Sequence, residues 1–379
     1  MSDIRVSART AARPSRKDVT ALLRRRIGAL SAVAILAIAP SGPAAAAAAP
    51  DPAQVNEFAI PAPNSAPDAI TVGPNGVLWF TEQLADRIGR VDPVTHNVLE
   101  YPLRAPSAPA SITAGADGGI WFAEFAGNRI GRIDPATGTV TEIPLPDPRS
   151  KPIRITSGPD GALWFSEPIA NRIGRLDPRT HGIREVTLPT PGAAPMEITT
   201  GPDRALWFAE QTADALGRID PRTGHVTEYR LPAAALTPYG LTTGPDHALW
   251  FTDYLGNAVW RFDPHHGVAE RVGLTQPKSN PAAIRTGPDG ALWFTEFGLD
   301  RLARLDPATH RITELPTPTK VSGPEGLAVG HDHALWFTEF TGNRIGRFDP
   351  APTPPPPVRI EQRPPSEGAP WTNPLPPLN

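Results

Sequence analysis

Seven carboxylic acids recur at almost constant spacing along this chain, each two residues after an aromatic pair. The tetrapeptide is Trp-Phe-(Thr/Ala/Ser)-(Glu/Asp), and its tryptophans follow one another at intervals of 42 or 43 residues. Carboxylates that converge on one point attract a hard cation and can transfer protons. The acids are Glu82, Glu124, Glu167, Glu210, Asp253, Glu296 and Glu339.

A structural role for these acids is the stronger interpretation. A residue that every stacked repeat contains usually serves the packing of the repeat itself. Each acid is followed by an arginine that can brace it through a charge-assisted hydrogen bond. These arginines are Arg87, Arg129, Arg172, Arg218, Arg261, Arg301 or Arg304, and Arg344. We therefore look for function where the repeats differ.

The repeats differ most two residues before the first apolar strand position. That position reads Asp68, Ala110, Ile153, Met196, Tyr239, Ala282 and Glu325. The fifth repeat also departs from the others at Asp253, Tyr254 and Trp260. Tyrosines and carboxylates around a pocket can bind a small polar or aromatic ligand. We expect Asp68, Tyr239, Asp253, Tyr254 and Glu296 to bind the ligand, and loose variation in a solvated ring is the alternative.

The elements that position these residues repeat with the same period. Each unit reads Pro-x-x-Ile-Thr-x-Gly-Pro-Asp-Gly-Ala-Leu-Trp-Phe-Thr-Glu, then Asn-Arg-Ile-Gly-Arg-x-Asp-Pro-x-Thr-Gly-x-Val-Thr-Glu-Tyr. It contains four short strand-like runs, which in the third unit are 154–156, 162–167, 172–176 and 183–188. Turn-forming residues separate these runs. Seven such units predict an all-β, seven-bladed β-propeller with four antiparallel strands per blade.

The predicted topology brings both candidate sets to one face. The innermost strand of a blade starts at this face, here called the top, and the next strand ends there. The outer-strand motif is absent after the last repeat and appears instead before the first one, at 55–61. We predict that this N-terminal strand closes blade seven and removes its open edge. Residues 358–362 are a competing outer strand that matches the motif less well.

The two ends of the chain differ from the repeats in composition. Residues 1–49 combine three arginines at 24–26, an apolar run at 27–38 and an alanine-rich stretch, which is typical of a cleaved signal peptide. The apolar run is short for a membrane anchor, which is the alternative. We expect the propeller at 50–350 to be secreted or associated with the cell envelope. Eleven prolines in the 29 residues of 351–379 predict a disordered tail.

Composition also excludes several kinds of site and partner. Residues 1–49 carry eight Lys or Arg and two Asp, so their removal changes the net charge from −3 to −9 and disfavours nucleic acid. The lack of cysteine excludes disulfides and thiolate metal sites. All nine histidines fall in predicted turns at the bottom face, which leaves no histidine base at the top. We expect a monomer, without a stable membrane span after signal cleavage, that binds a small molecule or peptide at the top.

The sequence of the repeats resembles that of a known family. Gly-Pro-Asp-Gly-Ala-Leu-Trp-Phe-Thr-Glu and Asn-Arg-Ile-Gly-Arg-x-Asp resemble the repeats of the virginiamycin B lyases, or streptogramin lyases, over 54–350. The resemblance implies a seven-bladed propeller and a Mg²⁺-dependent elimination that opens the ester ring of type B streptogramins. The family has a histidine where this chain has Ala282, and Glu-Pro-His where it has Gly323-Pro324-Glu325. A further family glutamate corresponds to Glu339.

The resemblance therefore implies a lyase in which Glu325 and Glu339 act as catalytic residues and as Mg²⁺ ligands in place of the family's histidines. Two other functions stay open. A non-catalytic propeller that binds a ligand or partner at the cell surface needs no histidine. A lactonase-like hydrolase needs a metal cage of Glu, Asn and Asp at the propeller axis, and the sequence identifies none.

Overall fold

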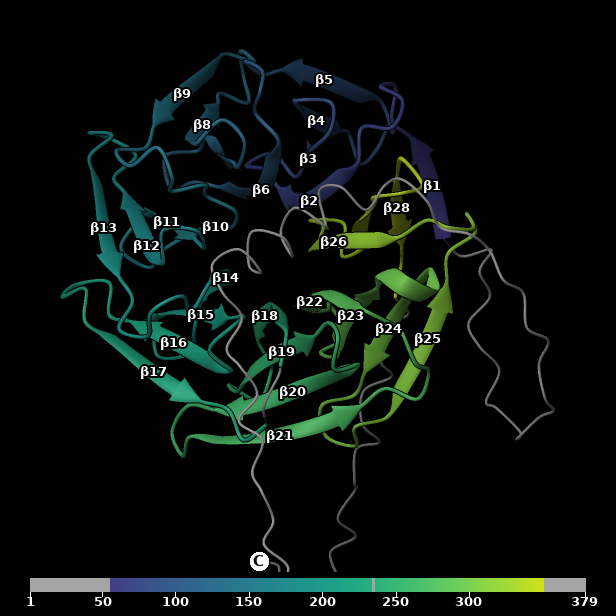
Figure 1. Ribbon diagram of the computed structural model, residues 1–379. Helices are drawn as coiled ribbons and strands as arrows, with labels where there is room; N and C mark the ends of the chain where they lie inside the picture. The colour runs from purple at the N-terminus through teal and green to yellow at the C-terminus, as the bar shows by residue number, and fades with distance from the viewer. Residues whose placement is uncertain (1–54, 234–235, 351–379) are drawn as a thin grey trace, which may run out of the picture.

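The computed structural model describes residues 55–233 and 236–350, which contain seven four-stranded antiparallel sheets. The sheets form a closed ring of blades (Figure 1). The prediction of an all-β, seven-bladed propeller is confirmed. The signal peptide predicted at 1–49, the tail predicted at 351–379 and the competing strand at 358–362 lie outside the described residues. No helix among the described residues is long and apolar enough to cross a membrane.

The two inner strands of each blade carry the most distinctive repeat sequence. The innermost strands are β2 (Pro67–Val72), β6 (Pro109–Ala114), β10 (Ile155–Ser157), β14 (Pro195–Thr200), β18 (Pro238–Thr243), β22 (Pro281–Thr286) and β26 (Pro324–Val329). The second strands, which carry the tetrapeptide, are β3 (Leu78–Glu82), β7 (Ile120–Glu124), β11 (Leu163–Glu167), β15 (Leu206–Glu210), β19 (Leu249–Asp253), β23 (Leu292–Glu296) and β27 (Leu335–Glu339).

The two outer strands complete each sheet. The third strands are β4 (Arg87–Val91), β8 (Arg129–Ile133), β12 (Arg172–Leu176), β16 (Ala215–Ile219), β20 (Ala258–Asp263), β24 (Arg301–Leu305) and β28 (Arg344–Phe348). The outermost strands are β5 (Val98–Pro102), β9 (Val140–Pro144), β13 (Ile183–Thr187), β17 (Val226–Arg230), β21 (Val268–Gly273), β25 (Ile312–Pro316) and β1 (Val55–Ala59). The short 3₁₀ helix η2 (Phe297–Leu299) lies between β23 and β24.

The second strand forms the core between blades. Successive strand residues project from opposite faces of a sheet, so Trp79 packs in one cluster with Ile112 of blade two, and Phe80 packs with Trp336 of blade seven. A Cβ atom on Gly89 would lie 2.1 Å from Cζ of Phe80, which explains the glycine in Arg-Ile-Gly-Arg. The aromatic pair therefore joins each blade to both of its neighbours.

Aspartates of the Gly-Pro-Asp turns bind the tryptophan and an arginine at the bottom face. Asp160 accepts hydrogen bonds from Nε1 of Trp164 at 3.0 Å and from Nε of Arg175 at 2.8 Å. The same arrangement holds Arg218 on Asp203 and Arg261 on Asp246. The prediction that Arg218 and Arg261 brace the acids of the tetrapeptides is therefore wrong. Both arginines lie one residue before the end of the regular hairpin pairing and project toward the bottom turn.

The N-terminal strand closes the ring as predicted. β1 pairs with β28 in antiparallel register, with Val55 opposite Phe348 and Ala59 opposite Arg344 (Figure 1). Glu57 on this strand also accepts a hydrogen bond from the backbone N–H of Thr319 at 2.9 Å. Blade seven is thereby assembled from both ends of the described chain.

Candidate functional site

A cavity of about 460 Å³ lies in the central channel and is lined by residues of all seven innermost strands. Its lining includes Asp68, Tyr239 and Glu325, three of the residues predicted from the differences between repeats. It also includes Arg154 and Glu197, which were not predicted. Positions that vary from blade to blade therefore contribute the charged lining of the cavity.

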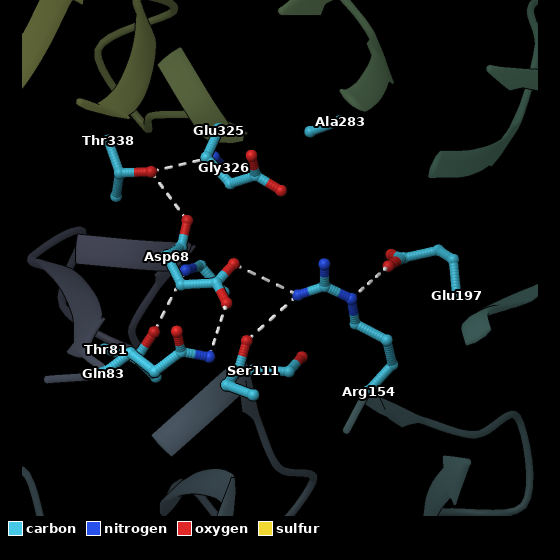
Figure 2. A network of polar contacts seen from close by, with 12 residues as sticks. Asp68, Thr81, Gln83, Ser111, Arg154, Glu197, Ala283, Glu325, Gly326 and Thr338 are labelled. Carbon is cyan, nitrogen blue, oxygen red and sulfur yellow. Dashed lines mark hydrogen bonds and ion pairs between the residues drawn. The ribbon is translucent and has the colours of Figure 1, made fainter. Parts of the chain in front are cut away.

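Arg154 is the centre of a polar network that crosses this channel (Figure 2). Its Nη1 donates to the backbone oxygen of Ala110 at 3.0 Å and to Oδ1 of Asp68 at 3.3 Å. Its Nε lies 3.3 Å from Oε2 of Glu197. Burial by itself lowers the pKa of Arg154, but the negative groups around it outweigh burial and raise the pKa overall. The guanidinium therefore stays charged although it is buried.

Tyr239 extends the network to the opposite wall. Its hydroxyl accepts a hydrogen bond from Nη2 of Arg154 and donates one to Oε1 of Glu325 at 2.5 Å. The Arg154 guanidinium also lies over the Tyr239 ring, 5.1 Å from its centroid. Asp68, Arg154, Tyr239 and Glu325 come from blades one, three, five and seven, so one hydrogen-bonded chain links four of the seven blades.

The two charged residues that the sequence reasoning missed stand one position later than the predicted set. That position reads Ala69, Ser111, Arg154, Glu197, Gly240, Ala283 and Gly326. Small residues are required in blades five and seven, because a Cβ on Gly240 would lie 2.3 Å from the oxygen of Ala282 and one on Gly326 would lie 2.4 Å from that of Asp68. The sequence did contain a signal for these two residues. Arg154 and Glu197 are the only charged residues at this position of the repeat, and they stand in two neighbouring repeats.

Threonine hydroxyls join neighbouring blades along the channel wall, from blade five to blade six and from blade seven to blade one. Oγ1 of Thr252 accepts from the backbone N–H of Gly240 at 2.8 Å and donates to the oxygen of Ala282 in the next blade at 2.7 Å. Thr338 makes the equivalent bonds to Gly326 at 2.8 Å and to Asp68 at 2.6 Å (Figure 2). These bonds fix the backbone that presents Tyr239, Glu325 and Asp68.

The acids of the tetrapeptides do not line the cavity. Asp253, Glu296 and Glu339 are buried inside the blades, because strand side chains project from the faces of a sheet and these faces are covered by the neighbouring blades. Asp253 accepts hydrogen bonds from the backbone of Thr237 at 2.9 Å and of Gly256 at 3.0 Å. The structure therefore brings Asp68, Tyr239 and Glu325 together and separates them from these three acids.

Bracing of the acids by arginine is confirmed in two blades. Arg129 lies 2.6 Å from Glu124, and Nε of Arg301 lies 3.1 Å from Glu296. In blades one and three the predicted arginines form their shortest ion pairs with other glutamates than those of the tetrapeptides. There they join the outermost strand, as Arg87 to Glu100 at 2.8 Å and Arg172 to Glu185 at 2.7 Å.

Glu210 has no arginine opposite it, because Ala215 occupies that position in β16. Burial, followed by the charge of Glu228, raises the pKa of Glu210 from 4.5 to about 8. Between these two values the folded protein binds a proton that the unfolded chain has lost, so stability falls as pH rises. We expect Glu210→Gln to reduce this fall by about 1 to 3 kcal/mol.

Thermal melts from pH 4.5 to pH 8, the window set by the Glu210 carboxyl, measure this effect. Gln276→Ala, at an exposed position without a titratable group, serves as the control and should leave the pH profile unchanged. Equal profiles for Glu210→Gln and the unmodified protein would show that Glu210 is ionised in the folded state.

The residues present do not fit the Mg²⁺ site that the family resemblance implies. Among the described residues, no three His, Cys, Asp or Glu side chains gather as a group that could hold a metal ion. Glu325 binds the Tyr239 hydroxyl, whereas Glu339 lies inside blade seven, where burial and the neighbouring Glu57 raise its pKa to about 9. A carboxyl that is protonated at neutral pH is a poor ligand for a hard cation.

A half-buried aromatic side chain directly follows the second strand in each of blades five to seven. The ring of Tyr254 lies 5.6 Å from that of Tyr239, and Phe297 packs edge-on against Phe340 with their centroids 6.2 Å apart. Trp260, which also distinguishes blade five, is instead buried and stacks on Phe251. We call Tyr254, Phe297 and Phe340 the aromatic arc.

Comparisons with known proteins agree on one family. The model of the virginiamycin B lyase family matches residues 53–308 and, in a second match, 180–353. A streptogramin B lyase structure is 35% identical with a TM-score of 0.73, over 78% of this chain and 97% of that one. A virginiamycin B lyase from Staphylococcus aureus is 36% identical with a TM-score of 0.73, over 78% and 99%.

A catalytically inactive variant of the Staphylococcus aureus enzyme, in a structure with quinupristin, is similar to the same degree, at 36% identity. More distant structures share the fold alone. The extracellular domain of a hybrid two-component system protein from B. thetaiotaomicron is 15% identical, with a TM-score of 0.60 over 76% of this chain and 40% of that one. Among curated proteins there is no match.

Proposed function

The chain belongs to the virginiamycin B lyase family, and we propose that it is an exported propeller that binds a small molecule or peptide at its top without transforming it, because Ala282 and Glu325 stand where the resemblance implies histidines. The observation that carries the proposal is the buried network of Asp68, Arg154, Tyr239 and Glu325 beside a channel cavity. Export is supported by the composition of residues 1–49.

The geometry supports binding in two ways. Oriented polar groups in a cavity give a ligand specificity, and the network that holds them is already hydrogen-bonded before a ligand arrives. The aromatic arc adds apolar surface next to these polar groups, and aromatic side chains lose little conformational entropy when a ligand packs on them. A ligand that is polar at one end and apolar at the other matches this arrangement.

Catalysis of the family reaction is the second candidate, and it is favoured by 36% identity over 99% of the Staphylococcus aureus enzyme. In that case Glu325 is the only member of the implied catalytic pair that faces the cavity. Its carboxylate would accept the proton that the elimination removes, and the ester carboxylate of the ring would depart. All nine histidines, which would otherwise supply the base, lie in turns between strands.

Quinupristin distinguishes the two candidates. We expect the protein that begins at residue 50 to bind quinupristin in titration calorimetry, and mass spectrometry to show an intact ring after prolonged incubation with Mg²⁺. Tyr239→Phe is expected to weaken binding about tenfold, because it removes the hydroxyl between Arg154 and Glu325. Tyr101→Phe, on the outermost strand β5, is the matched control.

Ring opening that disappears in Glu325→Gln would replace the binding proposal with the lyase candidate. Lack of quinupristin binding, together with an intact ring, would contradict both. Glu339→Gln separates the two glutamates, because Glu339 lies inside blade seven and should change neither binding nor ring opening.

A further inference from the structure

We propose that a groove at the bottom of the propeller, between blades three and four, binds an acidic peptide segment of a partner protein. The groove is separate from the channel and lies at the face opposite to the top, so this inference does not depend on the proposed function. It follows from arginines that come together only at this junction between blades.

The groove has a volume of about 1250 Å³. One wall is β13, the outermost strand of blade three, which lies at the rim of the ring beside blade four (Figure 1). The other wall consists of the bottom turns of blade four that contain Arg204 and Arg222. Small-molecule sites usually enclose about 300 to 1,000 Å³. This groove is larger and suits an extended chain.

Arg184 departs from the repeat on the first wall. It lies opposite Arg175 in the pairing of β12 with β13, and like charges that face each other across two strands destabilise a sheet. In the other blades the residue opposite the corresponding arginine is uncharged or acidic: Leu99, Thr141, Thr227, Glu270, Thr313 and Asn56. The sheet of blade three therefore carries a second arginine that its own pairing does not favour.

Arg204 departs from the repeat on the second wall. Its φ is 59°, in the left-handed region that favours glycine. The same turn position is a glycine with positive φ in four other blades: Gly76, Gly118, Gly161 and Gly290. A residue with a side chain pays a steric cost in this conformation. The geometry of the turn therefore does not explain the arginine.

Arg222, in the second bottom turn of blade four, completes the set. Arg184, Arg204 and Arg222 are all exposed, and within 55–233 and 236–350 none of the three forms a side-chain hydrogen bond or an ion pair. Among the described junctions between blades, this is the one with arginine at all three positions. The junction of blades two and three, for example, has Thr141, Gly161 and Arg179 there.

The acids in the groove already have partners. Asp160 binds Arg175 at 2.8 Å, Glu185 binds Arg172 at 2.7 Å, and Asp177 accepts the backbone N–H of Arg179 at 2.9 Å. The three unpaired guanidinium groups therefore give the groove a local positive charge, although the chain after residue 49 is negative overall. Guanidinium groups bind carboxylates through paired hydrogen bonds.

The rest of the lining favours a peptide over a phosphate polymer. Ile183 and Val186 of β13 are half-buried in the groove, and Pro159 and Pro221 add further apolar surface. β13 ends its sheet, so its outer edge is open to main-chain hydrogen bonds from an added strand. A phosphate polymer satisfies the arginines alone. An extended peptide that alternates acidic and apolar side chains satisfies the arginines, the apolar lining and the strand edge.

Fluorescence polarisation on the protein that begins at residue 50 tests this inference. The probes are a labelled short peptide of Glu-Ile-Glu-Ser repeats, the same peptide with lysine in place of glutamate, and unlabelled polyphosphate as a competitor. We expect the acidic peptide to bind, the lysine peptide to show no binding, and polyphosphate to compete only weakly. Arg184→Glu and Arg222→Glu should each weaken binding of the acidic peptide about tenfold or more.

Arg179→Glu is the matched control, because it makes the same charge change at the same turn position one blade earlier, outside the groove lining. It should change the affinity less than about twofold. Equal losses in Arg179→Glu and Arg222→Glu would show attraction by net charge alone and would overturn the groove. So would a lack of binding by the acidic peptide. Polyphosphate that competes as well as the unlabelled acidic peptide would overturn the peptide class.

A second measurement needs no ligand. The double variant Arg184→Thr with Arg204→Gly restores residues that other repeats have at these positions, so it should melt about 2 to 4 °C higher. The same variant should lose binding of the acidic peptide. An unchanged or lower melting temperature would show that the fold itself requires these arginines, and it would overturn the inference.

Discussion

Deletion of residues 51–62 is expected to lower the free energy of unfolding by more than about 5 kcal/mol. The deletion removes β1, whose five residues pair with β28, and it exposes the buried surface beneath Val55 and Ile60. It also removes the partner of Asn343, whose Nδ2 donates to the oxygen of Ala62 at 2.9 Å. The edge of β28 then stays unpaired. Urea unfolding followed by tryptophan fluorescence measures the change.

Two substitutions on β1 test how much individual side chains of this strand contribute to the free energy of unfolding. Phe58→Ala removes a ring that stacks on His96 and packs near Trp336, and it should cost about 2 to 4 kcal/mol. Asn56→Ala changes an exposed side chain of the same strand and should cost less than about 0.5 kcal/mol. An undiminished stability after the deletion would mean that another segment closes blade seven.

Arg154→Ala is expected to cost about 3 to 5 kcal/mol, because it leaves Asp68 and Glu197 in the channel without their shared cation. The loss should be partly recovered in the double variant Arg154→Ala with Asp68→Asn, since the second change removes one of the carboxylates that Arg154 contacts. Thermal and urea unfolding of the two single variants and the double variant gives the coupling between these side chains.

Arg149→Ala is the control for this prediction. Arg149 also pairs with an aspartate, Asp147 at 3.3 Å, but its side chain is 74% exposed, so its removal should cost at most about 0.5 kcal/mol. A similar small cost for Arg154→Ala would show that the channel is wet enough to screen its carboxylates. The stability argument for the network would then be wrong.

The repeat sequence was sufficient to predict the architecture. The spacing of Trp79 and its counterparts gave the number of blades, turn residues marked the hairpins, and the displaced motif at 55–61 located the closing strand. These features are local and periodic, and every unit repeats the same packing. They can therefore be predicted from a single sequence. Counting the repeats along the chain also assigns each residue to its blade.

The site was predicted less completely, because side-chain direction depends on how blades pack. Glu339 and Tyr239 both come at the top of their blades, yet Glu339 is buried inside its blade and Tyr239 lines the channel. Arg154 was missed because the search stopped one position earlier in the repeat. Its partners Asp68 and Tyr239 are 86 and 85 residues away, so no local pattern links them.

The position of β1 in blade seven also determines when the molecule can finish folding. β1 leaves the ribosome first among the described strands and its partner β28 leaves last, and the hydrogen-bonded residues Ser65 and Asn343 are 278 positions apart. The other six blades can form in turn from local hairpins, whereas the seventh must wait for the end of the array. Each new molecule therefore passes through an open horseshoe in which β1 has no partner strand yet, and two unfinished chains that meet at this stage can pair through the bare edge of β1.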